Sequence, residues 1–168
     1  MLFEVSTRDW VVKLSPESHP DELVVEVSSE CNMNCLHCFR RAAQDLKPQH
    51  MDLNTFEELV REALEIGVKK IVFSGWGEPL AHPRIDSMVK MCKELGLSVA
   101  LNTNGTLLNM FTDLVLRYVD ELFVSLDSAS AKTYASLRQL PIINTVIQSL
   151  EEVLRFKQLR GFPRGNHL

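Results

Sequence analysis

Short apolar runs rich in β-branched residues alternate along the chain with longer segments whose apolar positions repeat at helical spacing. The runs predict strands at residues 23–28, 70–75, 97–103 and 121–127. The segments between and after them predict helices at residues 55–66, 83–95, 110–118, 131–138 and 142–159. A strand, a helix and a second strand form the βαβ unit of a parallel sheet. We therefore expect an α/β fold in which about four parallel strands with outer helices make a partial barrel.

The first two helices have recognisable ends and faces. Asn54 and Glu57 predict the N-terminal cap of the first helix, and Gly67 predicts its C-terminal end. In the second helix Cys92 falls on an apolar stripe that it shares with Ile85, Met88, Val89 and Leu95. We interpret Cys92 as a core residue, because free cysteine is among the most often buried residue types.

The barrel pattern does not extend over the whole chain. Residues 1–22 form an N-terminal arm, in which Trp10–Leu14 is apolar enough to add one antiparallel strand. Residues 23–161 are the expected partial barrel, and residues 162–168 are a C-terminal tail.

Composition narrows the class of protein. A chain of 168 residues with 45% apolar and 24% charged residues is typical of one globular domain. The formal net charge of -4 argues against a nucleic-acid-binding face. No window approaches the roughly 18 apolar residues of a membrane span, and the start of the chain does not resemble a secretion signal. We expect a cytoplasmic protein without membrane contact, and in that reducing compartment clustered cysteines are more often ligands than disulfides.

Three of the four cysteines stand in one short loop after the first strand. Cys31, Cys35 and Cys38 have the spacing C-x3-C-x2-C. Three thiolates on a four-iron cluster would leave one iron open to another ligand. Two alternatives remain at this point: a zinc ion completed by His37 or His50, and three structural cysteines without a metal.

The cysteine spacing closely resembles the signature of the radical S-adenosylmethionine (radical SAM) enzymes, and the next strand ends carry further motifs of that family. The segment "SGWGEPL" at residues 74–80 is similar to the family's Gly-Gly-Glu-Pro loop. "NTNG" at residues 102–105 and "SLD" at residues 125–127 stand at the two following strand ends. The resemblance covers residues 23–161, and it is greatest to the branch that includes molybdenum-cofactor and peptide-modifying maturases.

The resemblance implies an activity and two cofactors. Cys31, Cys35 and Cys38 would hold a [4Fe-4S] cluster, and S-adenosylmethionine would chelate the open iron through its amine and carboxylate. An electron from an external donor would then cleave the cofactor to methionine and a 5′-deoxyadenosyl radical that abstracts hydrogen from a substrate. The alternative is an iron–sulfur or zinc-binding module without catalytic turnover.

The resemblance also implies roles for residues outside the cysteines. His37 would lie near the adenine, and the backbone of the loop of Gly75, Trp76, Gly77, Glu78 and Pro79 would receive the ammonium group of the cofactor. Polar side chains at the last two strand ends would meet its ribose or carboxylate, namely Asn102, Asn104, Ser125, Asp127 and Arg138. Simpler interpretations are a packing role for Trp76, local turn bonds for the Asn and Asp side chains, and a solvated helix end for Arg138.

Members of this family are built on six strands, whereas only four are predicted here. The chain is therefore expected to be the N-terminal part of a longer enzyme, the alternative being an unusually short member. The last predicted strand, at residues 121–127, would then lie at an uncovered sheet edge. We expect self-association through that edge, or its coverage by the last helix.

Overall fold

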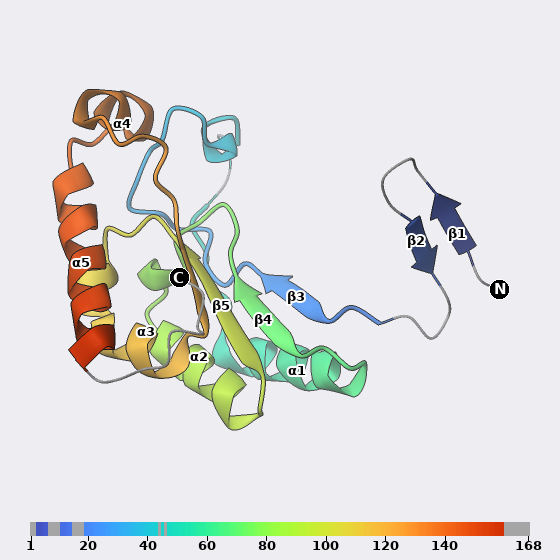
Figure 1. The fold of residues 1–168 in the computed structure, drawn as a ribbon. Coiled ribbons are helices and arrows are strands. Elements are labelled where there is room, and N and C mark those ends of the chain that lie inside the picture. The colour runs from blue at the N-terminus through green and yellow to red at the C-terminus, as the bar shows by residue number, and fades with distance from the viewer. Residues whose placement is uncertain (1–2, 7–10, 15–18, 44, 46, 160–168) are drawn as a thin grey trace.

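The computed structural model describes residues 3–6, 11–14, 19–43, 45 and 47–159. Its centre is a four-stranded parallel sheet in the order β3-β4-β5-β6 (Figure 1). The strands are β3 (Glu22–Val25), β4 (Lys70–Phe73), β5 (Ser98–Thr103) and β6 (Glu121–Val124). The predicted α/β fold with four parallel strands is confirmed. β3, β4 and β6 end before their predicted runs do, because the last residues of those runs lie in the loops that follow, whereas β5 differs from its predicted run only at residue 97.

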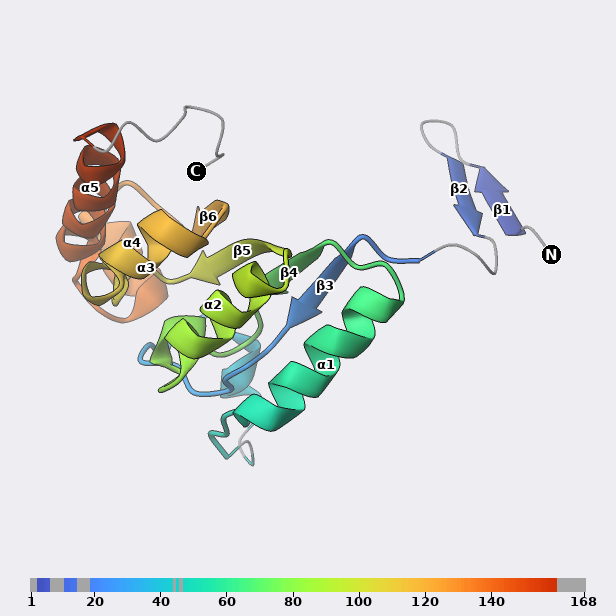
Figure 2. The ribbon, with the colours of Figure 1, turned by 90° about the horizontal axis from the view of Figure 1, so that it is seen from below.

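Helices follow each strand of the parallel sheet. The α-helices are α1 (Leu53–Glu65), α2 (Ile85–Glu94), α3 (Thr112–Tyr118), α4 (Ala131–Arg138) and α5 (Ile143–Leu159). Short 3-10 helices are η1 (Phe39–Arg41), η2 (Pro79–Ala81) and η3 (Leu108–Met110). In Figure 2, α1 and α2 cover one face of the sheet. The opposite, concave face of the sheet carries no helix from the described part of the chain.

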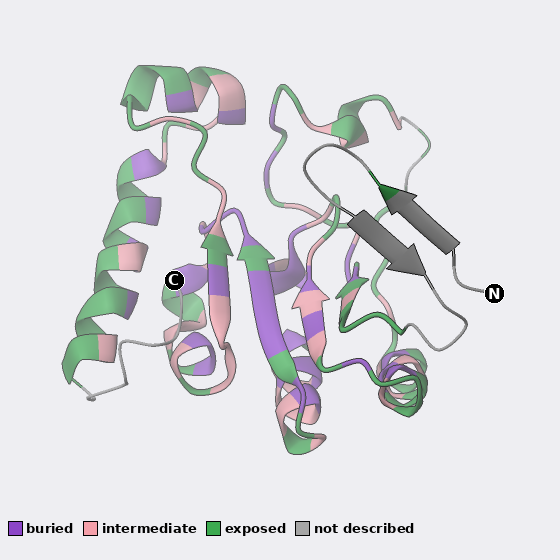
Figure 3. Ribbon diagram, turned by 45° about the vertical axis from the view of Figure 1, so that its right-hand side comes forward, coloured by how far each residue is buried: buried purple, intermediate pink, exposed green. Residues whose placement is uncertain are grey.

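The core lies between the sheet and its helices. One row of aligned residues crosses all four strands and is buried, with no more than 5% of any side chain exposed: Val25, Phe73, Leu101 and Leu122. Burying an apolar side chain of this size contributes roughly 1.5–3 kcal/mol. Figure 3 shows the buried stretch as most continuous along β5. Cys92 is fully buried in this core, and burial raises the pKa of its thiol to about 12, so it is the core residue that its helical position predicts.

The start of α1 differs from the predicted capping pair. The side chain of Asp52 accepts hydrogen bonds from the backbone N–H groups of Asn54 and Thr55, each at 3.0 Å. Asp52 is therefore the N-cap, and Glu57 instead pairs with Arg61 at 2.7 Å one turn later. Both Asp and Asn are good N-cap residues, so the sequence alone did not separate the two positions. Gly67 follows the helix with a φ of +90°, as its predicted place at the helix end requires.

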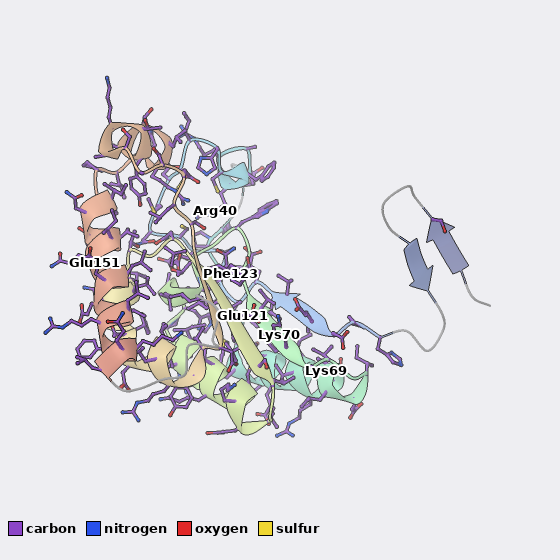
Figure 4. The ribbon with its side chains drawn as sticks, in the orientation of Figure 1. Arg40, Lys69, Lys70, Glu121, Phe123 and Glu151 are labelled. Atoms are coloured by element: carbon purple, nitrogen blue, oxygen red, sulfur yellow. The ribbon has the colours of Figure 1, made fainter. Side chains whose placement is uncertain are left out.

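The concave face of the sheet carries charged groups near the N-terminal ends of the strands. Lys70 on β4 contacts Glu22 on β3 at 2.6 Å and Glu121 on β6 at 2.8 Å. Figure 4 labels Lys70 and Glu121 on this face. The hydrogen bond to Glu121, then that to Glu22, raises the pKa of Lys70, so the lysine stays charged. The ion pair with Glu121 passes across β5, where Ala100 has a small, buried side chain.

The N-terminal arm contains a small separate sheet. β1 (Phe3–Ser6) pairs antiparallel with β2 (Val11–Leu14). Its ribbon lies apart from the parallel sheet in both Figure 1 and Figure 2. The apolar run predicted as a strand in the arm is β2, whereas Trp10 and the tail at residues 162–168 lie outside the described residues. None of the helices that the structure describes is long and apolar enough to cross a membrane.

Candidate functional site

A cavity of about 270 Å³ opens at the C-terminal ends of the four parallel strands. Ligand sites in parallel α/β folds lie at this end of the sheet. The cavity brings together most of the residues singled out in the sequence, from the C-terminal ends of the four strands, the segments that follow them and the end of α4: Cys31, Cys35, His37, Cys38, Gly75, Trp76, Gly77, Glu78, Asn102, Asn104, Ser125 and Arg138. A larger cavity of about 590 Å³ adjoins β3, but none of the cysteines lines it, so the smaller cavity is the candidate site.

Two predicted site residues do not line this cavity, and three further residues do. Pro79 is buried at the start of η2, and Asp127 lies behind Arg138. Phe39, Ser74 and Thr103 are the additional lining residues. Ser74 and Thr103 lie within the motifs at residues 74–80 and 102–105, but no role was assigned to them from the sequence. Phe39 directly follows the third cysteine, and that position was the available signal for it.

The cysteine loop is held against α4 as well as by its own turn. The N–H of Leu36 donates to the carbonyl of Leu137 at 2.7 Å, and the N–H of Cys38 donates to the carbonyl of Cys35 at 3.2 Å. Cys35 is buried, whereas Cys31 and Cys38 are partly exposed, and all three are free thiols. Burial raises the pKa of the Cys31 thiol. The loop thus presents three sulfur ligands to one cavity.

The arrangement fits an iron–sulfur cluster better than a single metal ion. Across the described ranges of the chain, no three Cys, His, Asp or Glu side chains come close enough together to hold one ion. Three thiolates that ligate different iron atoms of a cluster need not converge on one point. The two histidines weighed as zinc ligands have other partners, since His50 contacts Glu30 at 3.1 Å and His37 contacts Asp127 at 3.6 Å. The donor set of three soft sulfurs suits iron and sulfide.

The side chain of Glu78 links two loops of the site and is 2% exposed. Its Oε1 accepts from the Leu80 N–H at 3.1 Å and from the Thr103 hydroxyl at 2.7 Å, and its Oε2 accepts from the Asn104 N–H at 2.7 Å. Burial raises the pKa of this carboxyl group, and the three hydrogen bonds oppose that rise. The carboxylate joins the loop after β4 to the loop after β5, so its contribution to the site is to position these two loops.

The two glycines of the GWGEP loop allow close backbone contacts. A Cβ atom on Gly77 would lie 1.8 Å from the backbone oxygen of Ser28, which is far inside van der Waals contact. A Cβ atom on Gly75 would lie 2.6 Å from the side chain of Glu26. Trp76 between them is 51% exposed, and its ring stacks on that of Phe39 with centroids 6.1 Å apart. The two rings line the cavity, and the stacking on Phe39 also gives Trp76 the packing role of the simpler interpretation.

Polar side chains form a row across the ends of β4, β5 and β6. The Asn102 amide donates to the Ser74 hydroxyl at 3.2 Å, and the Ser125 hydroxyl donates to the Asn102 oxygen at 3.3 Å. Asn104 lies nearer the cysteines, where its amide donates to Asn32 at 2.9 Å and lies 3.8 Å from the Cys31 sulfur. These contacts cross between strands, so the side chains do more than close their own turns.

Arg138 enters the cavity from the end of α4. It is 6% exposed, so it is not the solvated helix end of the simpler interpretation. Its Nη1 donates to the Cys35 sulfur at 3.7 Å and its Nη2 donates to the Ser125 carbonyl at 2.9 Å. Its Nε lies 2.5 Å from Oδ2 of Asp127. Asp127 therefore orients the guanidinium from outside the cavity.

Comparisons with known proteins agree with this geometry. The cofactor-modifying protein of the tungsten-containing aldehyde ferredoxin oxidoreductase of Pyrococcus furiosus is 36% identical over 74% of this chain and 33% of its own length. The GTP 3′,8-cyclase of Nautilia profundicola is 35% identical over 80% of this chain and 44% of its own length. The chain thus spans between a third and a half of the length of these curated relatives.

Solved structures show the same fold. The crystal structure of SuiB from Streptococcus suis bound to S-adenosylmethionine superposes with a TM-score of 0.70 at 24% identity, over 82% of this chain and 32% of that one. SuiB bound to its precursor peptide SuiA gives a TM-score of 0.71 over 31% of that chain. A sequence profile of the Radical SAM superfamily matches residues 25–158, which include all four strand-end loops. The chain belongs to the Radical SAM superfamily.

Proposed function

We propose that this chain is the cofactor-binding part of an enzyme that holds a [4Fe-4S] cluster on Cys31, Cys35 and Cys38 and binds S-adenosylmethionine beside it. The observation that carries the proposal is the single cavity lined by all three thiols together with the loops of the next three strands. The bound cofactors would supply reductive cleavage of S-adenosylmethionine to a 5′-deoxyadenosyl radical for hydrogen abstraction from a substrate.

The contacts of the residues around the thiols suggest a role for each of them in binding the cofactor. The backbone of the loop from Gly75 to Gly77 borders the cavity without side chains at its two glycines, so a ligand can approach the peptide groups. The row of Ser74, Asn102 and Ser125 offers hydroxyl and amide groups to the hydroxyls of a ribose. The stacked Phe39 and Trp76 rings offer an apolar surface to the bound ligand.

The share of its relatives' length that this chain matches supports the proposal that the chain is part of a larger enzyme. Its relatives are about twice as long, since 74% of this chain covers 33% of one and 80% covers 44% of the other, and the concave face of the sheet lies open in the described residues. We infer that further strands outside this chain close the barrel and bind the substrate, and that an external protein or reductant supplies the electron. Residues 23–161 would be the barrel portion, preceded by the arm and followed by the tail.

Anaerobic reconstitution with iron and sulfide tests this proposal. Cluster-specific absorption and about four irons per chain are expected, with S-adenosylmethionine altering the electron paramagnetic resonance spectrum of the reduced cluster. Each of Cys31→Ala, Cys35→Ala and Cys38→Ala should lose the cluster, whereas Cys92→Ala should retain it, because Cys92 lies in the core. A protein that takes up zinc in place of iron, or a Cys31→Ala variant that keeps its full iron content, would contradict the proposal.

Release of 5′-deoxyadenosine distinguishes an enzyme from a metal-binding module that has no catalytic turnover. A strong reductant with S-adenosylmethionine should yield 5′-deoxyadenosine even without substrate. An iron-loaded chain that binds S-adenosylmethionine but never forms 5′-deoxyadenosine, also when joined to the rest of the enzyme, would favour the non-catalytic module.

A further inference from the structure

Glu26 lies directly under the GWGEP loop. It follows the last residue of β3, and its neighbours Val25 and Val27 are buried toward the helices at 4% and 1% exposure. Because side chains alternate along an extended chain, Glu26 points to the opposite, concave face. There its Oε1 accepts two hydrogen bonds, from the Trp76 N–H at 2.6 Å and from the Gly77 N–H at 3.0 Å.

These two hydrogen bonds determine how two peptide groups of the loop are turned. In a trans peptide the N–H and the C=O lie on opposite edges of one plane, and the described part of the chain has no cis peptide bond. With the N–H groups of Trp76 and Gly77 directed at Glu26, the carbonyls of Gly75 and Trp76 are directed away from it. Glu26 borders the 590 Å³ cavity, whereas Gly75 and Trp76 border the cavity of the cysteines, so the loop separates the carboxylate from the candidate site.

Gly75 is adapted to this contact. Its φ of +151° is rarely adopted by residues with a side chain, and a Cβ atom would overlap the Cβ, Cγ and Oε1 atoms of Glu26 at 2.6–2.7 Å. The glycine thus lets the carboxylate reach the next two amides. A hydrogen bond to a carboxylate also polarises the peptide group that donates it, because the full negative charge of the acceptor makes this bond stronger than one to a neutral group. The carbonyls on the other edge become stronger acceptors.

We propose that Glu26 is a positioning residue that turns the carbonyls of Gly75 and Trp76 into the cavity of the cysteines and strengthens them as acceptors for the ammonium group of S-adenosylmethionine. The inference rests on the proposed function. It assigns to a residue outside the recognised motifs a part in recognising one charged group of the ligand. Glu26 acts through the backbone and does not contact the ligand itself.

The experiment measures the affinity of the iron-loaded, unreduced protein for two ligands by anaerobic equilibrium dialysis. One is S-adenosylmethionine and the other is its analogue in which hydrogen replaces the α-amino group. Glu26→Gln should weaken binding of S-adenosylmethionine by about tenfold, since a hydrogen bond to a charged acceptor is stronger than one to a neutral amide. Glu26→Ala should weaken it further, and neither variant should change the affinity for the deaminated analogue by more than about twofold.

A matched control is Glu30→Gln, a carboxylate four residues along that contacts His50 at 3.1 Å. It should bind both ligands as the wild type does, and all variants should have equal iron content. Equal losses for both ligands in Glu26→Gln, or no loss for either, would overturn the role of Glu26 and leave the proposed function intact. A wild-type protein that holds its cluster but does not bind S-adenosylmethionine would overturn both.

Discussion

The guanidinium group of Arg138 lies against the sulfur of Cys35, with Nη1 donating to Sγ at 3.7 Å, although the two residues are 103 positions apart in the sequence. Asp127 and the Ser125 carbonyl hold the other side of the guanidinium. The arginine is thus directed at a proposed cluster ligand, whereas the resemblance to the family implied a contact with the carboxylate of the cofactor. Hydrogen bonds to the sulfurs are one of the ways in which a protein adjusts the reduction potential of a cluster.

Replacement of Arg138 should therefore change the reduction potential. In Arg138→Gln we expect a more negative potential. Reduction adds negative charge to the cluster, and the variant no longer has the positive charge of the guanidinium group that would stabilise it. Anaerobic redox titration followed by electron paramagnetic resonance measures it, and the exposed Arg61→Gln serves as the control. An unchanged potential with weakened binding of S-adenosylmethionine would instead assign Arg138 to the carboxylate of the cofactor.

Glu78→Gln should lower the free energy of unfolding by about 1–3 kcal/mol, because the amide has one acceptor oxygen for three buried donors and leaves at least one unsatisfied. Urea denaturation at neutral pH measures the change. The comparison is Glu57→Gln, which removes only an exposed pair with Arg61 and should cost about 0.3–0.5 kcal/mol. Equal losses in the two variants would show that the contacts of Glu78 with Thr103 and Asn104 do not stabilise the fold.

Gly77→Ala should disrupt the GWGEP loop, since the added Cβ atom would overlap the Ser28 oxygen. We expect lower affinity of the iron-loaded protein for S-adenosylmethionine together with lower stability. Gly67→Ala is the matched control: its Cβ would meet no atom within 4 Å, so only the backbone strain of a φ of +90° remains. That strain is worth roughly 1–2 kcal/mol and should leave ligand affinity unchanged. Normal affinity in Gly77→Ala would contradict the close contact.

Stability should depend on pH through His82, which is 3% exposed. Its Nε2–H donates to the Met51 carbonyl at 2.9 Å and its Nδ1 accepts from the Arg84 N–H at 3.0 Å, an arrangement that requires the neutral ring. Burial lowers the pKa of His82 below its ordinary 6.5. The unfolded chain then binds a proton more readily than the folded one. Stability from this group is therefore complete above pH 6.5 and declines as the pH falls from there toward the lower folded pKa.

Urea denaturation between pH 5 and pH 8, a range set by the ordinary histidine pKa of about 6.5, tests the role of His82. His82→Asn should be less stable at neutral pH and should show a smaller change across this range than the wild type. A pH dependence of equal size in the variant would assign the effect to another group.

Self-association should occur through the exposed edge of β6. Phe123 on this strand is 52% exposed and lies among the labelled residues of the concave face in Figure 4. Sedimentation velocity should show concentration-dependent association of the wild type and less in Phe123→Lys, because a charge on an edge strand opposes pairing. A wild type that remains monomeric at all concentrations would rule out this edge as a contact.

Local patterns predicted the elements well and the contacts between them poorly. The helix at residues 131–138 has the bounds that were predicted for it, and its N-cap, Ser130, directly precedes it. The cysteine loop and the other strand-end motifs were also visible in the sequence. By contrast, two of the three partners of Glu78, Thr103 and Asn104, lie 25 and 26 residues away, and only the parallel alignment of β4 with β5 brings them to it.

The contacts of Glu26 were even harder to predict from the sequence. In the sequence it is one polar position in an apolar strand, 50 residues before the amide that it binds. No periodicity distinguishes a carboxylate that faces solvent from one that anchors a neighbouring loop. The glycine at position 75 was recognised as part of a motif, but the reason for its small size is a side chain on another strand.

The ion pair between Lys70 and Glu121 joins strands that are not neighbours, across two interstrand spacings of about 4.8 Å each. The pair passes over Ala100, whose small side chain leaves room for it. A larger side chain at position 100 would displace this contact. The same three strands carry Ser74, Asn102 and Ser125 at their opposite ends, so the ion pair is a second link, besides the hydrogen bonds of that row, between strands that the proposed cofactor site requires side by side.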